Sequence, residues 1–155
     1  MGHADATIML ASPAPAPGFC CVRAPHIMHP VLTICLGACI GALARWRLGL
    51  WLNHDGAWLP WGTLAANLIG GYLVGLVIGS LQQYPELSPA WRLFWVTGLL
   101  GALTTFSSFS IEVVEMLMLA RWAQAAATVL AHLAGSLLLS YAGFRTALLF
   151  LAQRG

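Results

Sequence analysis

The feature that most constrains the fold is an apolar run from Leu93 to Leu119, which is long enough to cross a bilayer but has an unusual centre. The stretch 98–110 reads GLLGALTTFSSFS, so glycines precede a cluster of hydroxyl side chains and two phenylalanines. Irregular backbone survives at membrane depth only where protein buries it or water lines it. A helix that breaks there, with hydroxyls and ring edges at the break, is a candidate ion or substrate site.

The composition assigns the rest of the chain to a membrane as well. Of 155 residues, 59% are hydrophobic and only 8% are charged, with a mean hydropathy of +0.80. A soluble domain of this length needs more charge to solvate its surface, so we expect one all-α membrane domain of a few helices. The net charge of +2 is too weak to indicate nucleic-acid binding, and the cysteines lack a metal-binding spacing.

Hydropathy predicts four membrane spans, at 31–52, 61–81, 91–119 and 122–150. Residues 1–27 are predicted to be a disordered or mis-started N-terminal tail, because recurring prolines make a helix unfavourable there. The four-helix membrane domain then covers 28–155, and Met28 is an alternative start. Tryptophans gather near the predicted span ends, as in an interfacial belt, at Trp51, Trp58, Trp61, Trp91 and Trp122.

Small and polar residues recur every four positions along the spans. The second span carries Thr63, Asn67, Gly71, Gly75 and Gly79. A step of four keeps side chains on one face of a helix, and glycines on that face let two helices approach closely. We expect these faces to meet; packing explains the three glycines but does not explain Asn67.

The arginines give almost no preferred orientation. With four spans, four arginines lie on or near one side and three toward the other: Arg23, Arg92, Arg145 and Arg154 against Arg45, Arg47 and Arg121. The positive-inside rule therefore allows insertion both ways. Because four short helices rarely enclose a pore alone, an antiparallel homodimer of dual topology is the natural hypothesis.

The polar groups at membrane depth are neutral. All five acids lie outside the middle of the spans, whereas proton-coupled pumps and cation exporters usually place a carboxylate inside the membrane. No zinc-protease motif, nucleophile elbow or phosphate loop is present, so we expect no enzyme activity. An amide, hydroxyls and phenylalanine ring edges offer hydrogen-bond donors and positive edges, a lining that suits a small anion.

Three segments that carry these residues resemble the signature of the Fluc/CrcB fluoride channels: GALARW at 41–46, GTLAAN at 62–67 and GALTTFSSF at 101–109. The similarity runs from about Met28 to the C-terminus. It implies a four-helix subunit with a broken third helix, assembled as an antiparallel, dual-topology homodimer with two fluoride pathways in the cell inner membrane. The implied function is passive export of fluoride from the cytoplasm, with a structural sodium ion (Na+) at the dimer centre.

The same similarity implies roles for individual residues. Phe106 and Phe109 would turn electropositive ring edges toward fluoride, and Asn67 would donate an amide N–H. The hydroxyls along the fluoride pathway would be those of Ser108, Thr63 and Ser136. The main-chain carbonyls of the sodium site would come from Gly101 and Thr104. The charges of the vestibule would be Arg45 and Glu112.

Each of these residues also has a plainer interpretation. The phenylalanines could pack between helices, and Asn67 could join helices by a hydrogen bond worth roughly 0.6–2 kcal/mol. Arg45 could extend to the far interface, and Glu112 could be a solvated charge at a helix end. These alternatives stay open at the level of the sequence.

The fourth span departs from the family pattern of tyrosine and serine, because Thr128 and His132 stand at the corresponding spacing. A packed, hydrogen-bonded histidine is the commoner case, but a protonated His132 would attract anions and make conduction pH-sensitive. Two other functions remain as alternatives. A small multidrug-type transporter would need a glutamate in the first span, where this chain has only Arg45; a non-transporting subunit of a larger complex would need no ion site.

Overall fold

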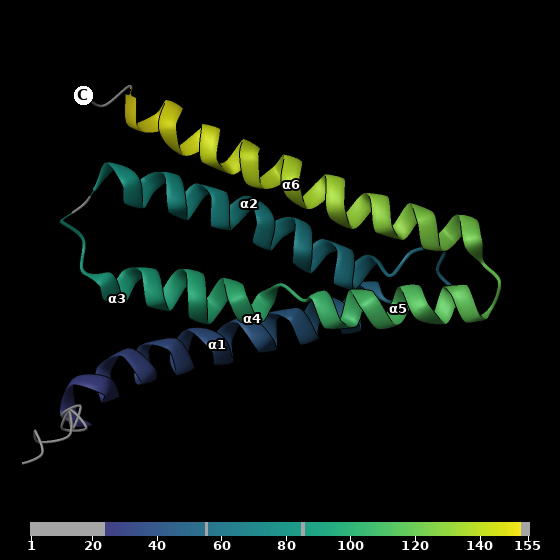
Figure 1. Ribbon diagram of the computed structural model, residues 1–155, viewed down its shortest axis with the longest axis horizontal. Coiled ribbons are helices and arrows are strands. Elements are labelled where there is room, and N and C mark those ends of the chain that lie inside the picture. Colours follow the sequence, from purple (N-terminus) through teal and green to yellow (C-terminus); the bar gives the residue numbers. More distant parts are fainter. Residues whose placement is uncertain (1–23, 55, 85, 153–155) are drawn as a thin grey trace, which may run out of the picture.

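The computed structural model describes residues 24–54, 56–84 and 86–152, and every regular element in that part of the chain is helical (Figure 1). Four helical segments are long and apolar enough to cross a membrane: His29–Leu52, Trp61–Gln83, Pro89–Met118 and Trp122–Leu151. The predicted all-α fold with four spans is therefore confirmed.

The first helix, α1, covers Ala24–Leu52 and begins before the predicted boundary at residue 28. The expectation that no helix forms before that boundary is wrong for residues 24–27. Pro25 stands in the first turn, where a missing N–H removes no hydrogen bond, so this proline does not prevent the helix from starting. The rest of the predicted tail, residues 1–23, lies outside the described residues.

Helices α2 (Trp61–Gln83) and α6 (Trp122–Ala152) run side by side and form the most extensive helix–helix contact in the described part of the chain (Figure 1). A Cβ atom added to Gly71 would lie 3.0 Å from the carbonyl oxygen of Ser136, and one added to Gly79 would lie 2.8 Å from the Cβ of Ala147. At Gly75 the added atom would overlap the backbone of Ser140. The packing role predicted for these glycines is confirmed.

The third span consists of four successive helical pieces, α3 (Pro89–Arg92), the π-helical η1 (Leu93–Leu100), α4 (Gly101–Leu103) and α5 (Phe106–Met118). Between α4 and α5, Thr104 (φ −77°, ψ 150°) and Thr105 (φ −147°, ψ 121°) are extended. Figure 1 shows α4 and α5 on either side of this segment, roughly in line. The polypeptide thus crosses the bundle without a continuous helical hydrogen-bond ladder.

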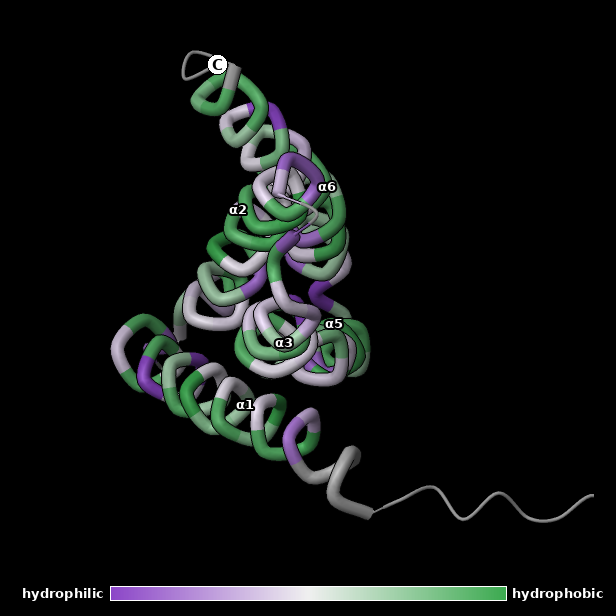
Figure 2. The backbone as a smooth tube through the Cα atoms, turned by 90° about the vertical axis from the view of Figure 1, so that its left-hand side faces the viewer, coloured by the Kyte–Doolittle hydropathy of each residue, from purple (hydrophilic) through white to green (hydrophobic). Residues whose placement is uncertain are grey.

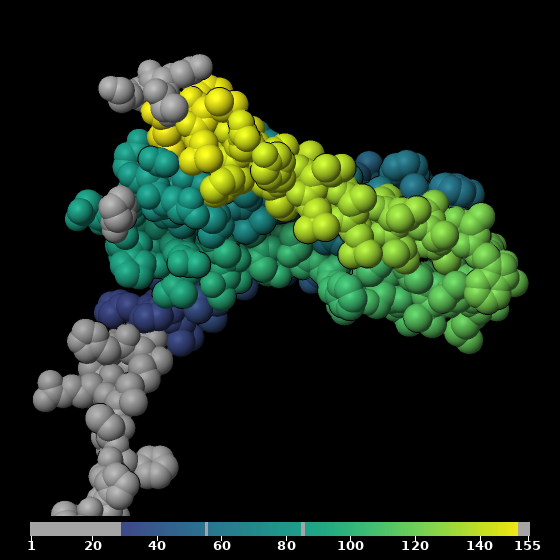
Figure 3. All heavy atoms as spheres, turned by 45° about the horizontal axis from the view of Figure 1, so that its top comes forward, coloured from purple at the N-terminus to yellow at the C-terminus, as the bar shows by residue number. Residues whose placement is uncertain are grey.

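Two glycine contacts hold α1 against the part of the third span that precedes the extended segment. An added Cβ atom at Gly37 would lie 2.8 Å from the N of Leu99, and one at Gly98 would lie 2.7 Å from the carbonyl oxygen of Ile34. Figure 2 shows α1 crossing beneath the third span. On the opposite side, α6 packs against both α2 and α5 (Figure 3).

The outer surface of the bundle is apolar. Hydrophobic residues follow all the long helices in Figure 2, and many large ones on α1 and α6, such as Leu36 and Leu138, are exposed. The tryptophans of the predicted belt are exposed as well, and Trp61 and Trp122 begin their spans. This arrangement is typical of a multi-pass membrane protein.

Candidate functional site

The extended segment is organised by Thr105, which is the N-cap of α5. Its Oγ1 accepts a hydrogen bond from the N–H of Ser108 at 3.2 Å, and its hydroxyl lies 3.2 Å from those of Ser107 and Ser108. Threonine is a favoured N-cap because its side chain satisfies an N–H that has no partner within the first turn. Thr105 therefore explains why α5 restarts at Phe106.

Asn67 of α2 forms two hydrogen bonds with the main chain of the extended segment. Its Oδ1 accepts a hydrogen bond from the N–H of Thr105 at 2.7 Å, and its Nδ2 donates to the carbonyl oxygen of Thr105 at 3.0 Å. In a continuous helix the same N–H would bind the carbonyl of Gly101. The amide of Asn67 thus replaces the helical partner that the N–H of Thr105 lacks.

His132 of α6 lies against the other side of this amide. Its Nδ1 is 3.0 Å from Nδ2 of Asn67, and the residue is only 4% exposed. The imidazole also packs against Phe109, with ring centroids 4.7 Å apart. The interpretation of His132 as a packed, hydrogen-bonded histidine is confirmed.

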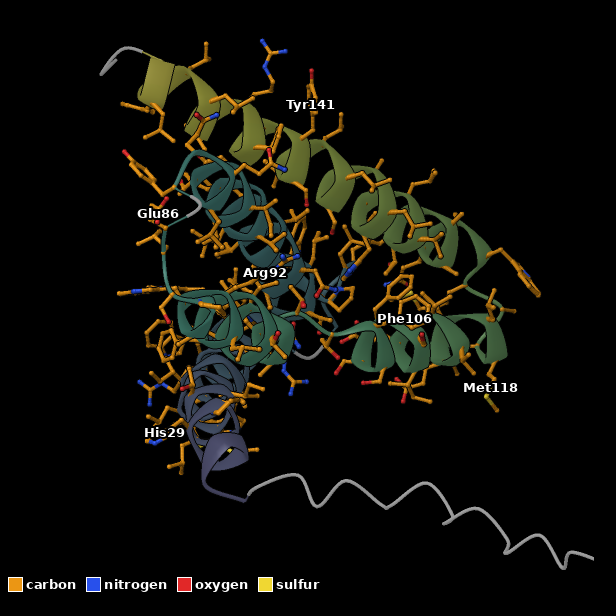
Figure 4. All side chains as sticks on the ribbon, turned by 60° about the vertical axis from the view of Figure 1, so that its left-hand side comes forward. His29, Glu86, Arg92, Phe106, Met118 and Tyr141 are labelled. Carbon is orange, nitrogen blue, oxygen red and sulfur yellow. The ribbon has the colours of Figure 1, made fainter. Side chains whose placement is uncertain are left out.

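These residues surround a cavity of about 350 Å³, here called the central cavity. Its wall combines the extended segment with the facing sides of α2, α5 and α6: Asn67, Gly71, Thr104, Thr105, Phe106, Phe109, His132, Leu133, Ser136 and Leu137. The rings of Phe106 and Phe109 are 5.5 Å apart at 57°. Phe106 stands at the start of α5 (Figure 4) and is 74% exposed, whereas Phe109 is buried.

A second cavity, of about 380 Å³ and here called the outer cavity, lies toward the loop between α1 and α2. Thr63 donates a hydrogen bond to Oε1 of Glu112 at 2.5 Å across it. Two buried atoms, Nε of Arg45 and Oε2 of Glu112, have no hydrogen-bond partner among the described residues. Glu112 is therefore not a fully solvated charge, and Arg45 turns part of its guanidinium toward the protein.

The two cavities share Thr105, which lines both of them. Among the predicted site residues, the central cavity brings together Asn67, Thr104, Phe106, Phe109 and Ser136, and the outer cavity brings together Arg45, Thr63, Ser108 and Glu112. Thr105 of the extended segment therefore stands between the two cavities.

Three residues need a separate account. Gly101 lines neither cavity. Thr128 also lines neither; it is fully buried, and its hydroxyl donates to the carbonyl of Gln124 in its own helix at 2.9 Å. Thr105 was not predicted as a site residue. Its position immediately before the second half of an apolar run, where an N-cap threonine is favoured, is the signal that could have identified it.

Two main-chain carbonyls before α5, those of Gly101 and Thr104, do not receive the N–H that a continuous helix would supply. The N–H of Thr105 goes to Asn67 rather than to the carbonyl of Gly101, and the N–H of Ser108 goes to Oγ1 of Thr105 rather than to the carbonyl of Thr104. Gly101 is exposed. A hard cation accepts such oxygen ligands, so these two carbonyls fit the predicted sodium site.

Comparison with known proteins gives consistent matches over most of the chain. Residues 32–144 match the family described as CrcB-like protein, Camphor Resistance (CrcB). Proteins named fluoride-specific ion channel FluC from Albidiferax ferrireducens and Variovorax paradoxus are each 60% identical, over 127 and 120 residues; the matches cover 82% and 77% of this chain and 97% and 95% of those proteins. The Paracidovorax citrulli protein of the same name is 55% identical over 123 residues, 79% of this chain and 97% of its own.

Proposed function

The chain belongs to the CrcB family of fluoride-specific ion channels, and we propose that it exports fluoride passively from the cytoplasm across the cell inner membrane. The chain is an ion channel rather than an enzyme. The observation that carries the proposed route is the extended segment at Thr104 and Thr105, where neutral polar groups and aromatic rings from three helices surround a cavity. The described residues that line this cavity include no carboxylate.

The chemistry of the central cavity matches the needs of a small anion. Fluoride holds its hydration water tightly, so each water that it loses must be replaced by a directed donor. The ring edges of Phe106 and Phe109 are electropositive, and Ser136 supplies a hydroxyl. An inside-negative potential favours exit of the anion by about 2.3 kcal/mol per 100 mV, so no coupled energy source is required.

The outer cavity serves as the vestibule in this proposal. Arg45 attracts the anion, and the hydroxyls of Thr63 and Ser108 take part in its passage toward Thr105. The bond from Thr63 to Glu112 is consistent with a carboxylate that competes with the anion for the same hydroxyl. The role of Asn67 as a direct donor to fluoride stays a prediction, because both of its N–H groups already have acceptors in this arrangement.

The functional unit that we propose is an antiparallel homodimer. Phe106 lines the central cavity and yet is largely exposed, and Gly101 beside the extended segment is exposed too. A second copy against this face would cover both residues and close the cavity. The nearly equal distribution of arginines between the two sides supports insertion in both orientations.

The sodium ion belongs to the same proposal. The carbonyl oxygens of Gly101 and Thr104 are the groups that would hold it, because neither receives the N–H that a continuous helix would supply. When bound, a cation there would offset the cost of holding an anion in a low-dielectric environment. The chain's own contribution is to keep this backbone extended through Asn67 and Thr105.

Fluoride efflux from liposomes that contain only this protein, followed with a fluoride electrode, tests the proposal. We expect rapid efflux with the wild type and none with Phe106→Leu, while size-exclusion chromatography shows the same dimer for both. Efflux by the wild type alone also excludes a subunit that needs other proteins to transport. Equal efflux by the two proteins would remove Phe106 from the pathway.

A further inference from the structure

The hydrogen bonds around Asn67 determine which atoms of its amide face which neighbours. The N–H and the carbonyl of Thr105 both contact this amide, at 2.7 Å from Oδ1 and 3.0 Å from Nδ2. Exchanging the oxygen and nitrogen would set two donors against each other and two acceptors against each other. The amide orientation is therefore fixed by the main chain, and Nδ2 is the atom that faces His132.

This orientation fixes the tautomer of His132. An amide nitrogen donates but does not accept, so Nδ1 of His132, at 3.0 Å from Nδ2, must be the acceptor. A neutral imidazole that accepts at Nδ1 carries its proton on Nε2. The same count shows that the two N–H groups of Asn67 are both used, one by Thr105 and one by His132.

The Nε2–H group that results has no partner. Nε2 is a buried atom without a hydrogen-bond partner among the described residues, on a side chain that is 4% exposed and lines the central cavity. Buried donors are rarely left unpaired, because the desolvation of the group is then uncompensated. An unpaired donor at a cavity without carboxylates points to an anionic acceptor that the chain itself does not provide.

From these observations we propose that Nε2–H of His132, held in this tautomer by Asn67, is a hydrogen-bond donor to the permeating anion. The inference rests on the proposed fluoride conduction and adds a specific donor to it. Asn67 is then a positioning residue, which acts on the anion through His132 and through the backbone of Thr105. Nε2 is enclosed in this structure, so an anion reaches it when a neighbour moves; Phe109, which lines the central cavity and is in ring contact with His132, is one such neighbour.

Two substitutions separate the donor from the acceptor of His132. In His132→Gln the carboxamide nitrogen lies near the position of Nε2, so the donor to the cavity is kept and the acceptor for Asn67 is lost. In His132→Asn the carboxamide lies near Nδ1, so the acceptor for Asn67 is kept and the donor is displaced from the cavity. We expect fluoride efflux of His132→Gln to exceed that of His132→Asn by about tenfold, the factor expected for a hydrogen bond to a charged group. The opposite order, or equal efflux, would overturn the proposal.

Solid-state nuclear magnetic resonance of the wild-type protein, labelled with ¹⁵N in its histidines, gives a readout that does not depend on flux. The His132 signal is identified by its loss in His132→Asn. We expect a neutral ring protonated at Nε2, with ¹⁹F from bound fluoride dephasing Nε2 faster than Nδ1, and we expect Asn67→Ala to change the tautomer signature. A ring protonated at Nδ1, or no dephasing in protein that releases fluoride from liposomes, contradicts the inference while the proposed function stands. Wild-type liposomes that retain fluoride contradict both.

Discussion

Two regions of the molecule contain the same kinds of residue but use them differently. One is the contact between α2 and α6; the other is the junction of α2, α5 and α6 around the extended segment. In the helix–helix contact, Gly75 faces the backbone of Ser140, and elsewhere on these two helices the hydroxyls of Ser80 and Thr146 donate to carbonyls one turn back in their own helices. At the junction, Asn67 pairs with Thr105 and His132, which belong to two other segments. The hydroxyls of Ser80 and Thr146 are satisfied within their own helices, whereas the amide of Asn67 is satisfied by two other segments.

This difference shows why a stripe of small and polar residues is not by itself an ion site. A hydroxyl in a regular helix can return to its own backbone, so it costs little to bury and offers little to a ligand. The hydroxyl of Thr104 still donates to the carbonyl of Leu100, one turn back, but the interruption at Thr104 and Thr105 leaves main-chain groups, such as the N–H of Thr105, that must find partners elsewhere. The site forms where the helix cannot satisfy its own hydrogen bonds.

Of the substitutions that compare these two regions, Asn67→Ala should reduce transport most, because it removes both hydrogen bonds from this side chain to Thr105. Each buried partner left unsatisfied costs about 1–3 kcal/mol, so we expect fluoride efflux to fall by at least about 100-fold. The fluoride electrode measures the efflux, and size-exclusion chromatography checks that the dimer is retained. Wild-type efflux from this variant would mean that the junction is only a packing contact.

The largest effect on stability is expected in the α2–α6 contact. In Gly75→Ala the new methyl group overlaps the backbone of Ser140, and over-packing of this kind lowers the free energy of unfolding by about 1–3 kcal/mol. Gly49→Ala is the matched control, because its methyl group would lie 4.0 Å from Asn53 and meets nothing closer. Denaturant unfolding in detergent should separate the two; equal midpoints would show that close approach of α2 and α6 is not needed.

A moderate effect is expected for Thr63→Val, which leaves Oε1 of Glu112 without its donor in the outer cavity. An unsatisfied carboxylate oxygen there should reduce efflux by about tenfold. Thr146→Val is the control, since the hydroxyl of Thr146 bonds only within α6, to the carbonyl of Ala142 at 2.7 Å. If both variants lose efflux alike, the effect belongs to helix packing and not to the vestibule.

The smallest effect is expected for Ser80→Ala in α2. The hydroxyl of Ser80 donates to the carbonyl of Leu76 in the same helix at 2.9 Å, and that carbonyl keeps its helical partner when the hydroxyl is removed. Stability should change by no more than about 0.5 kcal/mol, and efflux should equal that of the wild type. A clear loss of efflux would show that the pathway extends along the α2–α6 contact.

Much of the fold could be predicted because it depends on residues that are close in the sequence. Span length follows from runs of apolar residues, and the approach of α2 to α6 follows from glycines at steps of four such as Gly71 and Gly75. The start of α1 was missed because Pro25 was interpreted as excluding a helix, although a proline in the first turn has no such effect. Residues 1–23 are outside the described part of the chain, so the predicted tail stays a prediction there.

The site could be predicted only in outline. The motif around Thr104–Phe109 and the isolated Asn67 indicated where polar chemistry lies, but not which atoms pair. Asn67 meets Thr105 and His132 across 38 and 65 positions of sequence, and those pairings depend on how three helices pack. Because hydrogen-bond direction is a property of the assembled structure, the tautomer of His132 had no signal in the sequence.

The central claim is that neutral donors at an interrupted membrane span select fluoride, and the ratio of fluoride to chloride efflux tests it most directly. Liposomes containing only the wild-type protein should be loaded with both anions, and each anion should be followed with its own electrode in one experiment. We predict that fluoride leaves while chloride is retained, because the larger anion cannot be surrounded by donors placed for fluoride. Chloride leaving as readily as fluoride would contradict the account.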